Sequence, residues 1–340
     1  MRVKLKPVAE QVIVITGASS GIGLATARLA AERGAKLVLV ARDRDDIEQA
    51  AGQVRAMGGE AVTVVGDVAD ERTMQHAAEV AVERYGRIDT WVNNAGVSVY
   101  GKLEEVAMED ARRLFETNYW GMVNGSLAAL PQLKRNGGAL INVGSIVSDT
   151  AMPLQGHYSA SKHAVKGFTD ALRMELEKEG APVSVTLIKP TAIDTPYPEH
   201  ARNYMEVEPT HPPPVYAPKV VAKAVLACAE RPLRDVYVGG GAKAMAAMSR
   251  WAPRLADRYK ERFMFDQQRS DRPSNGEDTL FAPVPGDGRV RGSYPGHVMG
   301  SSLYTTMSLD PRGRTILRAL AVGLGVAFVV GAGSLVDRTH

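Results

Sequence analysis

The sequence predicts an α/β fold, a doubly wound parallel sheet with helices on both faces. Short apolar runs rich in β-branched residues alternate with segments of helical spacing over residues 11–238. A glycine-rich turn at residues 16–23 joins the first apolar run to the first helical segment. Polar side chains follow several of the apolar runs, at the edge of a parallel sheet where ligands bind. These three observations together point to a nucleotide-binding architecture.

The composition is that of a globular protein with one large or two ordinary domains. The 340 residues are 45% hydrophobic and 23% charged. The formal net charge is only +3 and the basic residues are scattered, so no nucleic-acid partner is expected. The chain has a single cysteine, Cys228, which excludes a disulfide within the chain. Because Cys228 lies in an apolar helical run, we expect its thiol to be buried. We expect neither a signal peptide nor a metal site.

The first part of the chain alternates strands with helices. A cap by Asp70 is expected at the start of the third helix. The expected strands are residues 11–16, 36–40, 61–65 and 88–92, and the expected helices are residues 24–33, 46–57 and 70–85.

The turn after the first strand has the composition of a phosphate-binding loop. Small residues allow the backbone to approach a pyrophosphate, and the free N–H groups at the start of the following helix bind its charge. The spacing is not that of the general G-x-G-x-x-G fingerprint, and a turn that serves only packing is the alternative. The cofactor-binding candidates in this turn are Gly17, Ser19, Ser20, Gly21, Ile22 and Gly23.

Arg42 follows the second strand and predicts a preference for NADP(H) over NAD(H). In dinucleotide-binding units an acidic residue near this strand end binds the adenine ribose, whereas an arginine accommodates a 2′-phosphate. Here Ala41 ends the strand and Arg42 comes next. The carboxylate of Asp43 is the competing ligand for the ribose.

Polar residues also follow the third and fourth strands. A side chain at the end of the third strand is placed to meet the adenine, and the loop after the fourth strand is placed to line the cofactor. Asn93 is interpreted as a structural residue that braces neighbouring strands. The cofactor-binding candidates at these two strand ends are Asp67, Val68, Asn94, Ala95 and Gly96.

The second half of the chain completes a sheet of about seven strands. Asn118 interrupts a helical stretch, and because a short amide is a poor helix former, a kink is the structural alternative to a site role there. Ser145 places a hydroxyl just after the fifth strand. The expected helices are residues 109–130 and 158–179, and the expected strands are residues 139–143, 183–188 and 235–238.

Tyr158 and Lys162 are the candidate catalytic pair. Residues four apart on a helix lie on the same face, so the phenol and the ammonium should point into the same space. A neighbouring positive charge favours the phenolate and lowers the pKa of a tyrosine from its usual value near 10. Such a phenol exchanges protons near neutral pH. An ordinary exposed helix pair is the alternative when this spacing is considered alone.

The ordered motifs of the chain resemble those of the short-chain dehydrogenase/reductase superfamily. The matching motifs are the turn at residues 16–23, Asp67, residues 93–96, Asn118, Ser145, Tyr158 with Lys162, and residues 190–195. The resemblance covers residues 8–240 or so and implies a single Rossmann-like domain. It also implies oxidation of an alcohol or reduction of a carbonyl with a nicotinamide cofactor.

The resemblance assigns roles to individual residues. It implies that Tyr158 is the acid/base, that Lys162 lowers its pKa and binds the nicotinamide ribose, and that Ser145 holds the substrate oxygen. Asn118 would position a water beside Lys162 in a proton relay. The resemblance further implies nicotinamide contacts from Pro190, Ile193 and Thr195.

Residues 194–219 are too long for an ordinary connection and are interpreted as a substrate lid. Its Tyr197, Tyr204 and Met205, with residues 152–154, suggest a rather apolar pocket for a lipophilic alcohol or ketone. The alternative functions are a catalytically silent NADP(H)-binding regulatory or scaffold protein and an epimerase or dehydratase on the same fold.

The C-terminal part lies outside this catalytic domain, which is expected to span residues 8–265. Residues 242–265 predict an amphipathic helix that packs on the domain or meets a membrane surface or a second copy. Residues 266–311 predict an irregular linker, and residues 312–340 a hydrophobic tail. The apolar run at residues 316–336 predicts a transmembrane anchor, with the catalytic domain on the cytoplasmic side because arginines precede it. A homo-oligomer is compatible with the sequence.

Overall fold

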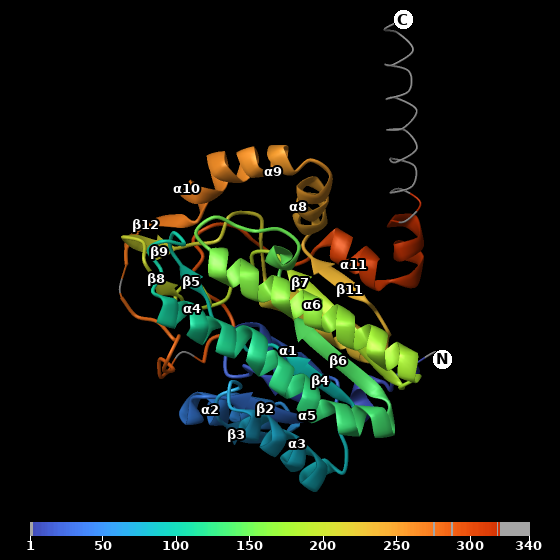
Figure 1. Ribbon diagram of the computed structural model, residues 1–340. Helices are drawn as coiled ribbons and strands as arrows, with labels where there is room; N and C mark the ends of the chain where they lie inside the picture. Colours follow the sequence, from blue (N-terminus) through green and yellow to red (C-terminus); the bar gives the residue numbers. More distant parts are fainter. Residues whose placement is uncertain (1–2, 275, 287, 318, 320–340) are drawn as a thin grey trace, which may run out of the picture.

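The computed structural model describes residues 3–274, 276–286, 288–317 and 319, and its centre is a parallel sheet (Figure 1). Seven strands form this sheet, in the order β11-β7-β6-β4-β1-β2-β3. All six pairings between them are parallel. The doubly wound sheet predicted from the sequence is therefore confirmed. The strands are β1 (Val12–Thr16), β2 (Lys36–Ala41), β3 (Glu60–Val65), β4 (Thr90–Asn93), β6 (Gly138–Val143), β7 (Val183–Pro190) and β11 (Asp235–Val238).

The strand order reverses on either side of β1. Ile15 of β1 pairs with Leu39 of β2 on one side and with Val92 of β4 on the other. In an open α/β sheet, the loops after two such strands separate and leave a crevice at their carboxyl ends. The topology therefore places a crevice next to the glycine turn that follows β1.

Helices cover both faces of the sheet and enclose two hydrophobic clusters. One face is covered by α1 (Gly21–Glu32), α2 (Arg44–Ala56) and α7 (Pro218–Glu230). The other is covered by α3 (Glu71–Tyr85), α5 (Gly121–Asn136) and α6 (Gly156–Glu179). Two local predictions are confirmed, because the Asp70 carboxylate caps α3 and the Cys228 thiol is buried.

The chain between α4 (Met108–Phe115) and α5 contains a π-helical turn at Glu116–Trp120. Asn118 lies in this turn, and its side chain bonds the backbone of Val97 from both of its polar atoms. The amide is thus satisfied by the loop after β4 and not by its own helix. The helical stretch is irregular at Asn118, where a kink was the structural alternative to a site role, and single π-turns of this kind are frequent at functional sites.

Short strands fix the segment that follows β7. Here β8 (Arg202–Asn203) pairs with β5 (Val99–Tyr100), and β10 (Val215–Tyr216) pairs with β13 (Val298–Met299). The third strand of the segment, β9 (Val207–Pro209), pairs with β12 (Arg269–Pro273). The described part of residues 266–311 contains short helices and strands between irregular stretches, and it packs against the domain that contains the sheet.

The predicted amphipathic helix at residues 242–265 is divided between α8 (Gly240–Trp251), α9 (Pro253–Tyr259), a π-helical turn (Lys260–Met264) and the start of α10 (Phe265–Gln267). Ala256 and Met264 are buried against the domain, whereas Trp251 is 80% exposed. One apolar edge of this helical segment therefore faces outward. The helix α11 (Leu303–Leu309) follows near the C-terminal end, and residues 311–317 are again helical.

The predicted membrane anchor falls almost entirely outside the described residues. Of residues 316–336, the structure describes 316, 317 and 319. Within the part of the chain that is described, none of the helices combines the length and the hydropathy of a membrane span. The anchor therefore stays a prediction from the sequence.

Candidate active site

A cavity of about 310 Å³ lies at the carboxyl ends of the sheet strands. It extends from the glycine turn after β1 to the start of α6. All the predicted site residues line it except Gly23 and Asn118. The predicted residues in its wall are Gly17, Ser19, Ser20, Gly21, Ile22, Arg42, Asp67, Val68, Asn94, Ala95, Gly96, Ser145, Tyr158, Lys162, Pro190, Ile193 and Thr195.

The glycine turn forms a cradle that side chains would fill. Gly17 has φ +63° and lies so near Ala95 that an added Cβ would approach the Ala95 Cα to 2.8 Å. The side-chain amide of Asn94 donates to the carbonyl oxygens of Thr16 and Gly17, at 3.0 Å each. The start of α1, where a helix dipole attracts negative charge, has no side-chain cap, although the Gly21 N–H donates to the Arg289 carbonyl at 2.8 Å. The backbone present here fits the pyrophosphate of a dinucleotide.

Gly23 acts behind this cradle and does not face the cavity. A Cβ at this position would lie 1.9 Å from the carbonyl oxygen of Gly17. The missing side chain therefore lets the first turn of α1 pack directly on the loop. The predicted role of Gly23 in cofactor binding is indirect in this structure, through the shape of the loop.

Charged residues surround the end of the cavity beyond β2 and β3. The Arg42 side chain is part-buried there, and desolvation lowers its pKa from the usual range of an arginine. Asp43 is the N-cap of α2, and its carboxylate accepts from the N–H of Asp46 at 2.8 Å. Asp67 forms an ion pair with Arg113. Arginine side chains are thus the principal cations at the edge where an adenine ribose would lie.

Tyr158 and Lys162 face the same cavity, as their spacing predicts. The Lys162 Nζ lies 5.7 Å from the centre of the Tyr158 ring and donates to the Val143 carbonyl at 3.0 Å. Both side chains are buried. Burial lowers the pKa of Lys162 to about 8. At neutral pH the ammonium is therefore retained, although at a cost in desolvation.

The predicted lowering of the Tyr158 pKa by Lys162 is not what the structure gives. Burial raises the pKa of Tyr158 above 10, and the hydroxyls of Tyr197 and Ser145 act in the opposite direction. Desolvation outweighs the other effects because the phenol is buried in the wall of the cavity. The phenol is consequently protonated at neutral pH and available as a proton donor.

Ser145 and Asn118 support the catalytic pair from two other elements. Ser145 begins the short 3₁₀ helix Ile146–Ser148, which fixes its hydroxyl beside the cavity. Asn118 Nδ2 also donates to the Ser161 hydroxyl at 3.2 Å, which links the π-turn to α6. A Cβ on Gly96 would lie 3.3 Å from Asn118 Oδ1 and 3.7 Å from Lys162 Nζ. The two predicted relay residues therefore approach the same glycine.

The interpretation of Asn93 as a structural residue is confirmed. Its side chain accepts from the indole of Trp91 and donates to Ser126 and Asn142, all at 3.0 Å or less. These bonds join β4 to β6 and α5 beneath the cavity. The Asn93 side chain therefore holds the sheet edge, and the site residues begin with Asn94.

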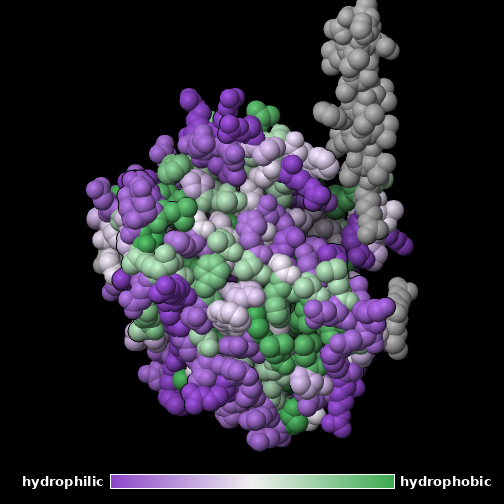
Figure 2. Space-filling model, viewed as in Figure 1, coloured by the Kyte–Doolittle hydropathy of each residue, from purple (hydrophilic) through white to green (hydrophobic). Residues whose placement is uncertain are grey.

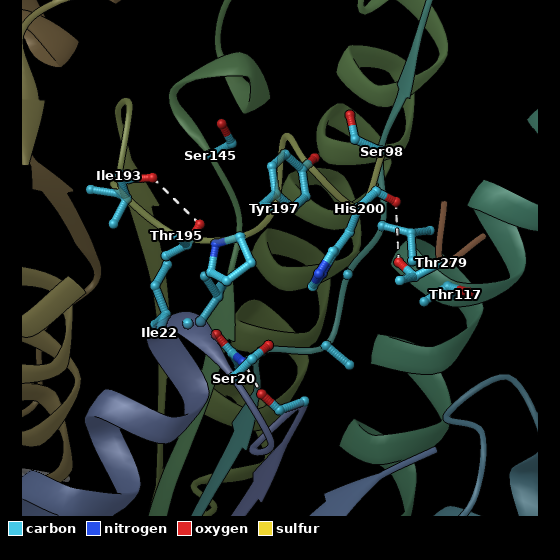
Figure 3. A pocket seen from close by; sticks show the side chains of 18 of the residues that line it. Ser20, Ile22, Ser98, Thr117, Ser145, Ile193, Thr195, Tyr197, His200 and Thr279 are labelled. Atoms are coloured by element: carbon cyan, nitrogen blue, oxygen red, sulfur yellow. Dashed lines mark hydrogen bonds between the residues drawn. The ribbon is translucent and has the colours of Figure 1, made fainter. Parts of the chain in front are cut away.

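Several residues that line the cavity were not predicted from the sequence. Ser98 follows the 94–96 loop, and His200 and His211 come from the lid. Figure 3 shows Ser98, Tyr197 and Ser145 around one end of the cavity, with His200 and Thr279 bonded to each other nearby. Burial lowers the pKa of His211 to about 4, so its imidazole is neutral at physiological pH. Histidines in a lid carried no motif that could have identified them.

The apolar lid pocket is confirmed only in part. Tyr197 and Met152 line the cavity, and the Tyr197 ring lies 5.7 Å from the Tyr158 ring. Tyr204 and Met205 do not line the cavity: Tyr204 donates to Asp110 at 2.7 Å, and Met205 packs in a cluster with Tyr100. The alternating fold pattern gave no information on which lid residues turn inward.

Comparisons with known proteins agree with this geometry. A family model described as short chain dehydrogenase matches residues 11–205. The uncharacterized oxidoreductase YxnA of Bacillus subtilis (strain 168) is 46% identical over 314 residues, which is 91% of this chain and 88% of that protein. The uncharacterized oxidoreductase Lmo0432 of Listeria monocytogenes is 38% identical, over 54% of this chain and 75% of that protein.

Solved structures show the same architecture. A short chain dehydrogenase/reductase from Burkholderia phymatum in complex with NAD superimposes with a TM-score of 0.66 at 27% identity, over 72% of this chain and 94% of that chain. An alcohol dehydrogenase from Thermococcus sibiricus complexed with 5-hydroxy-NADP gives a TM-score of 0.59 at 28% identity, over 67% of this chain and 95% of that chain.

Proposed function

This chain belongs to the short-chain dehydrogenase/reductase family, and we propose that it is an NADP(H)-dependent oxidoreductase acting on a secondary alcohol or ketone. The observation that supports this most is the meeting of Tyr158, Lys162 and Ser145 at one end of a cavity whose other end is the phosphate cradle. A regulatory or scaffold protein would not need this arrangement. Fold alone would not justify the proposal, because one fold hosts many functions.

The residues of the site perform a proton transfer beside a hydride transfer. When bound, the nicotinamide supplies or accepts the hydride at the substrate carbon. In the direction of reduction, the Tyr158 hydroxyl donates its proton to the carbonyl oxygen. The Ser145 hydroxyl donates a hydrogen bond to the same oxygen, and Lys162 holds positive charge near it as negative charge develops. Asn118 would position a water that returns a proton to the Tyr158 oxygen.

The preference for NADP(H) rests on the positive charge beyond β2. Arg42 lies at the cavity edge, while the two carboxylates closest to it in sequence and space, Asp43 and Asp67, already bond the backbone and Arg113. A guanidinium binds a 2′-phosphate through several N–H groups at once. The relatives of known structure carry either NAD or an NADP derivative, so the family does not decide between the two.

A panel of ketones and secondary alcohols tests the proposed function. We expect the purified full chain to oxidise NADPH in the presence of at least one ketone, with kcat/KM for NADPH at least about tenfold above that for NADH. Absorbance of the reduced nicotinamide measures both. Binding of NADPH with no turnover across the panel would favour the silent regulatory protein. Turnover without a net change in the cofactor would favour the epimerase or dehydratase.

The substrate pocket combines apolar walls with unpaired hydroxyls, which refines the expectation of a lipophilic substrate. Met152 and Val147 supply apolar surface. Among the residues that the structure describes, the buried Tyr197 hydroxyl and Ser98 Oγ make no hydrogen bond of regular geometry, although the Tyr197 hydroxyl lies near enough to Tyr158 to lower its pKa. Leaving such groups unpaired is costly, and a substrate oxygen removes that cost. We therefore favour a lipophilic ketone with a second oxygen near the carbonyl.

Replacement of Tyr197 by Phe tests this substrate class. For a ketone with a neighbouring hydroxyl, we expect Tyr197→Phe to lower kcat/KM about tenfold or more, since one buried hydrogen bond is lost. For the same ketone without the hydroxyl, the change should stay below about twofold. Steady-state kinetics on the matched pair of substrates measures the difference. An equal loss for both substrates would contradict the assignment.

Membrane attachment through residues 316–336 remains a proposal from the sequence alone. The apolar run and the preceding arginines support it, with the catalytic domain on the cytoplasmic side. Fractionation of cells that produce the chain with and without residues 312–340 tests it. Recovery of the full chain in the supernatant would contradict it.

We also propose that the chain forms a homo-oligomer, because two neighbouring helices carry exposed apolar side chains. Leu127 on α5 and Met174 on α6 are more than half exposed, and Figure 2 shows hydrophobic surface gathered on the face that these helices form. Sedimentation of the purified chain measures its oligomeric state. A monomer at all concentrations would contradict the proposal.

A further inference from the structure

Residues 278–286, here called the strap, lie across the cavity although they follow the expected catalytic domain. In Figure 1 the orange chain after β12 runs down past α4 toward α2. Three strap residues, Thr279, Pro283 and Val284, line the same cavity as the glycine turn. The strap therefore forms part of the wall at the end beyond β2 and β3.

Two arginines of the domain hold the strap by its backbone. Arg42 donates to the carbonyl oxygen of Thr279 and, from Nη1, to those of Leu280 at 3.3 Å and Phe281 at 3.4 Å. Arg113 donates from Nε to the Leu280 carbonyl at 3.0 Å. These bonds satisfy carbonyl groups that have no partner in a sheet or helix. The strap is thus bound by the residues that also mark the expected ribose and adenine positions.

The strap is also anchored on both sides of these arginines. The Thr279 N–H donates to the carbonyl of His200 at 2.9 Å, which fixes the strap to the lid. The Gly286 N–H donates to the Asp46 carboxylate at 3.2 Å, which fixes it to α2. The strap therefore bridges the lid and the helix that follows β2.

Leu280 is the apolar anchor of the strap. Its side chain is fully buried and joins a cluster with Val97, Leu114 and Tyr158. The next residue, Phe281, is 48% exposed. Burial of a leucine side chain is worth far more than most surface contacts, so Leu280 should hold the strap closed.

We propose that the strap forms the outer wall of the site for the adenosine half of a nicotinamide dinucleotide and must open before the cofactor exchanges. The inference rests on the proposed function for the identity of the ligand. The cavity beneath the strap is continuous with the phosphate cradle, so closure leaves space for the dinucleotide. A guanidinium has five N–H donors, which allows Arg42 to bind a 2′-phosphate and the strap carbonyls together. Opening must break the arginine bonds and expose Leu280, which makes cofactor release slow.

The dissociation rate of NADPH tests the proposal without any need for turnover. The full chain is loaded with NADPH and mixed with excess NADP⁺ in a stopped-flow instrument, and the loss of nicotinamide fluorescence gives the rate. We expect Leu280→Ala to raise this rate at least about tenfold. The matched control Phe281→Ala, one residue away on the exposed side, should change it less than about twofold.

The outcomes separate the strap from the proposed function. Equal dissociation rates for the wild type, Leu280→Ala and Phe281→Ala would overturn the proposal that the strap must open. The proposed function would be unaffected by that result, provided that the wild type binds NADPH. Failure of the wild type to bind NADPH or NADH would overturn both.

Hydrogen exchange of the wild type supplies a measurement that does not depend on a variant folding correctly. We expect the amides of residues 279–286 to exchange at least about tenfold more slowly when NADPH is bound, because the strap opens less often. Unchanged exchange in the strap, together with slowed exchange in the glycine turn, would overturn the proposal.

Discussion

Tyr158→Phe is expected to lower kcat for ketone reduction by about a hundredfold to ten-thousandfold, the range typical of a lost general acid. The substitution removes the hydroxyl and keeps the ring. That ring packs in a cluster with Val97 and Leu280 and against Tyr197, so the fold should be retained. We expect the dissociation constant for NADPH to change less than about threefold, because the hydroxyl acts on the substrate. Single-turnover oxidation of NADPH and a fluorescence titration measure the two quantities.

Tyr259→Phe is the matched control for this prediction. It makes the same chemical change on α9, where the side chain is 39% exposed and its ring contacts Phe263. Its kcat should equal that of the wild type. If Tyr158→Phe bound NADPH normally and kept full turnover, the catalytic assignment would be wrong.

Gly23→Ala is expected to weaken NADPH binding at least about a hundredfold. The new Cβ would lie 1.9 Å from the Gly17 carbonyl oxygen and 2.8 Å from the Asn94 side-chain nitrogen. The loop or the start of α1 must therefore shift, and displacements of about 1 Å at a binding site can cost a hundredfold. We also expect a lower melting temperature, since the shift disturbs the contact between α1 and the loop. Fluorescence titration and thermal unfolding measure these effects.

Gly52→Ala provides the contrast. Gly52 lies inside α2, and no atom would meet its added Cβ within 4 Å. This substitution should leave NADPH binding unchanged and stabilise the protein by about 0.5–1 kcal/mol through the unfolded state. If the two substitutions weakened NADPH binding equally, the effect would not arise from the shape of the cradle.

The fold was predictable because each strand of the sheet carries its own signal. A strand such as β1 is buried along its whole length and therefore reads as an unbroken apolar run. The turns between strands and helices contain glycine and capping residues such as Asp70. The parallel, doubly wound arrangement is not encoded in any single segment, and it was predicted from the alternation of strands with helices and from the resemblance of the motifs.

The placement of Tyr158 and Lys162 in one cavity was also predictable, because they lie one helical turn apart and need only a helix to meet. The effect of burial on the pKa values of Tyr158 and Lys162 could not be predicted from the sequence. Sequence spacing indicates which charges are neighbours, whereas desolvation depends on every element that covers the phenol. The prediction of a lowered pKa for Tyr158 failed for this reason.

The strap illustrates a second limit. The strap lies within residues 266–311, which are rich in Gly, Pro, Ser and charged residues and show no periodicity, so the composition of this stretch indicated a linker. The strap is held instead by backbone carbonyls that accept from Arg42 and Arg113, and by one buried leucine. Backbone acceptors are present in every sequence, and only the folded chain shows which of them an arginine reaches.

We propose that this chain moves a hydride from a nicotinamide to a substrate carbon while Tyr158 supplies the proton. Isotope transfer tests this with NADPH that carries deuterium at C4, prepared separately with each of the two stereochemistries, and a ketone that the enzyme turns over. Mass spectrometry and NMR of the alcohol locate the label. We expect one deuterium on the carbinol carbon with one of the two labelled cofactors. Alcohol without deuterium from either cofactor would contradict hydride transfer from the nicotinamide.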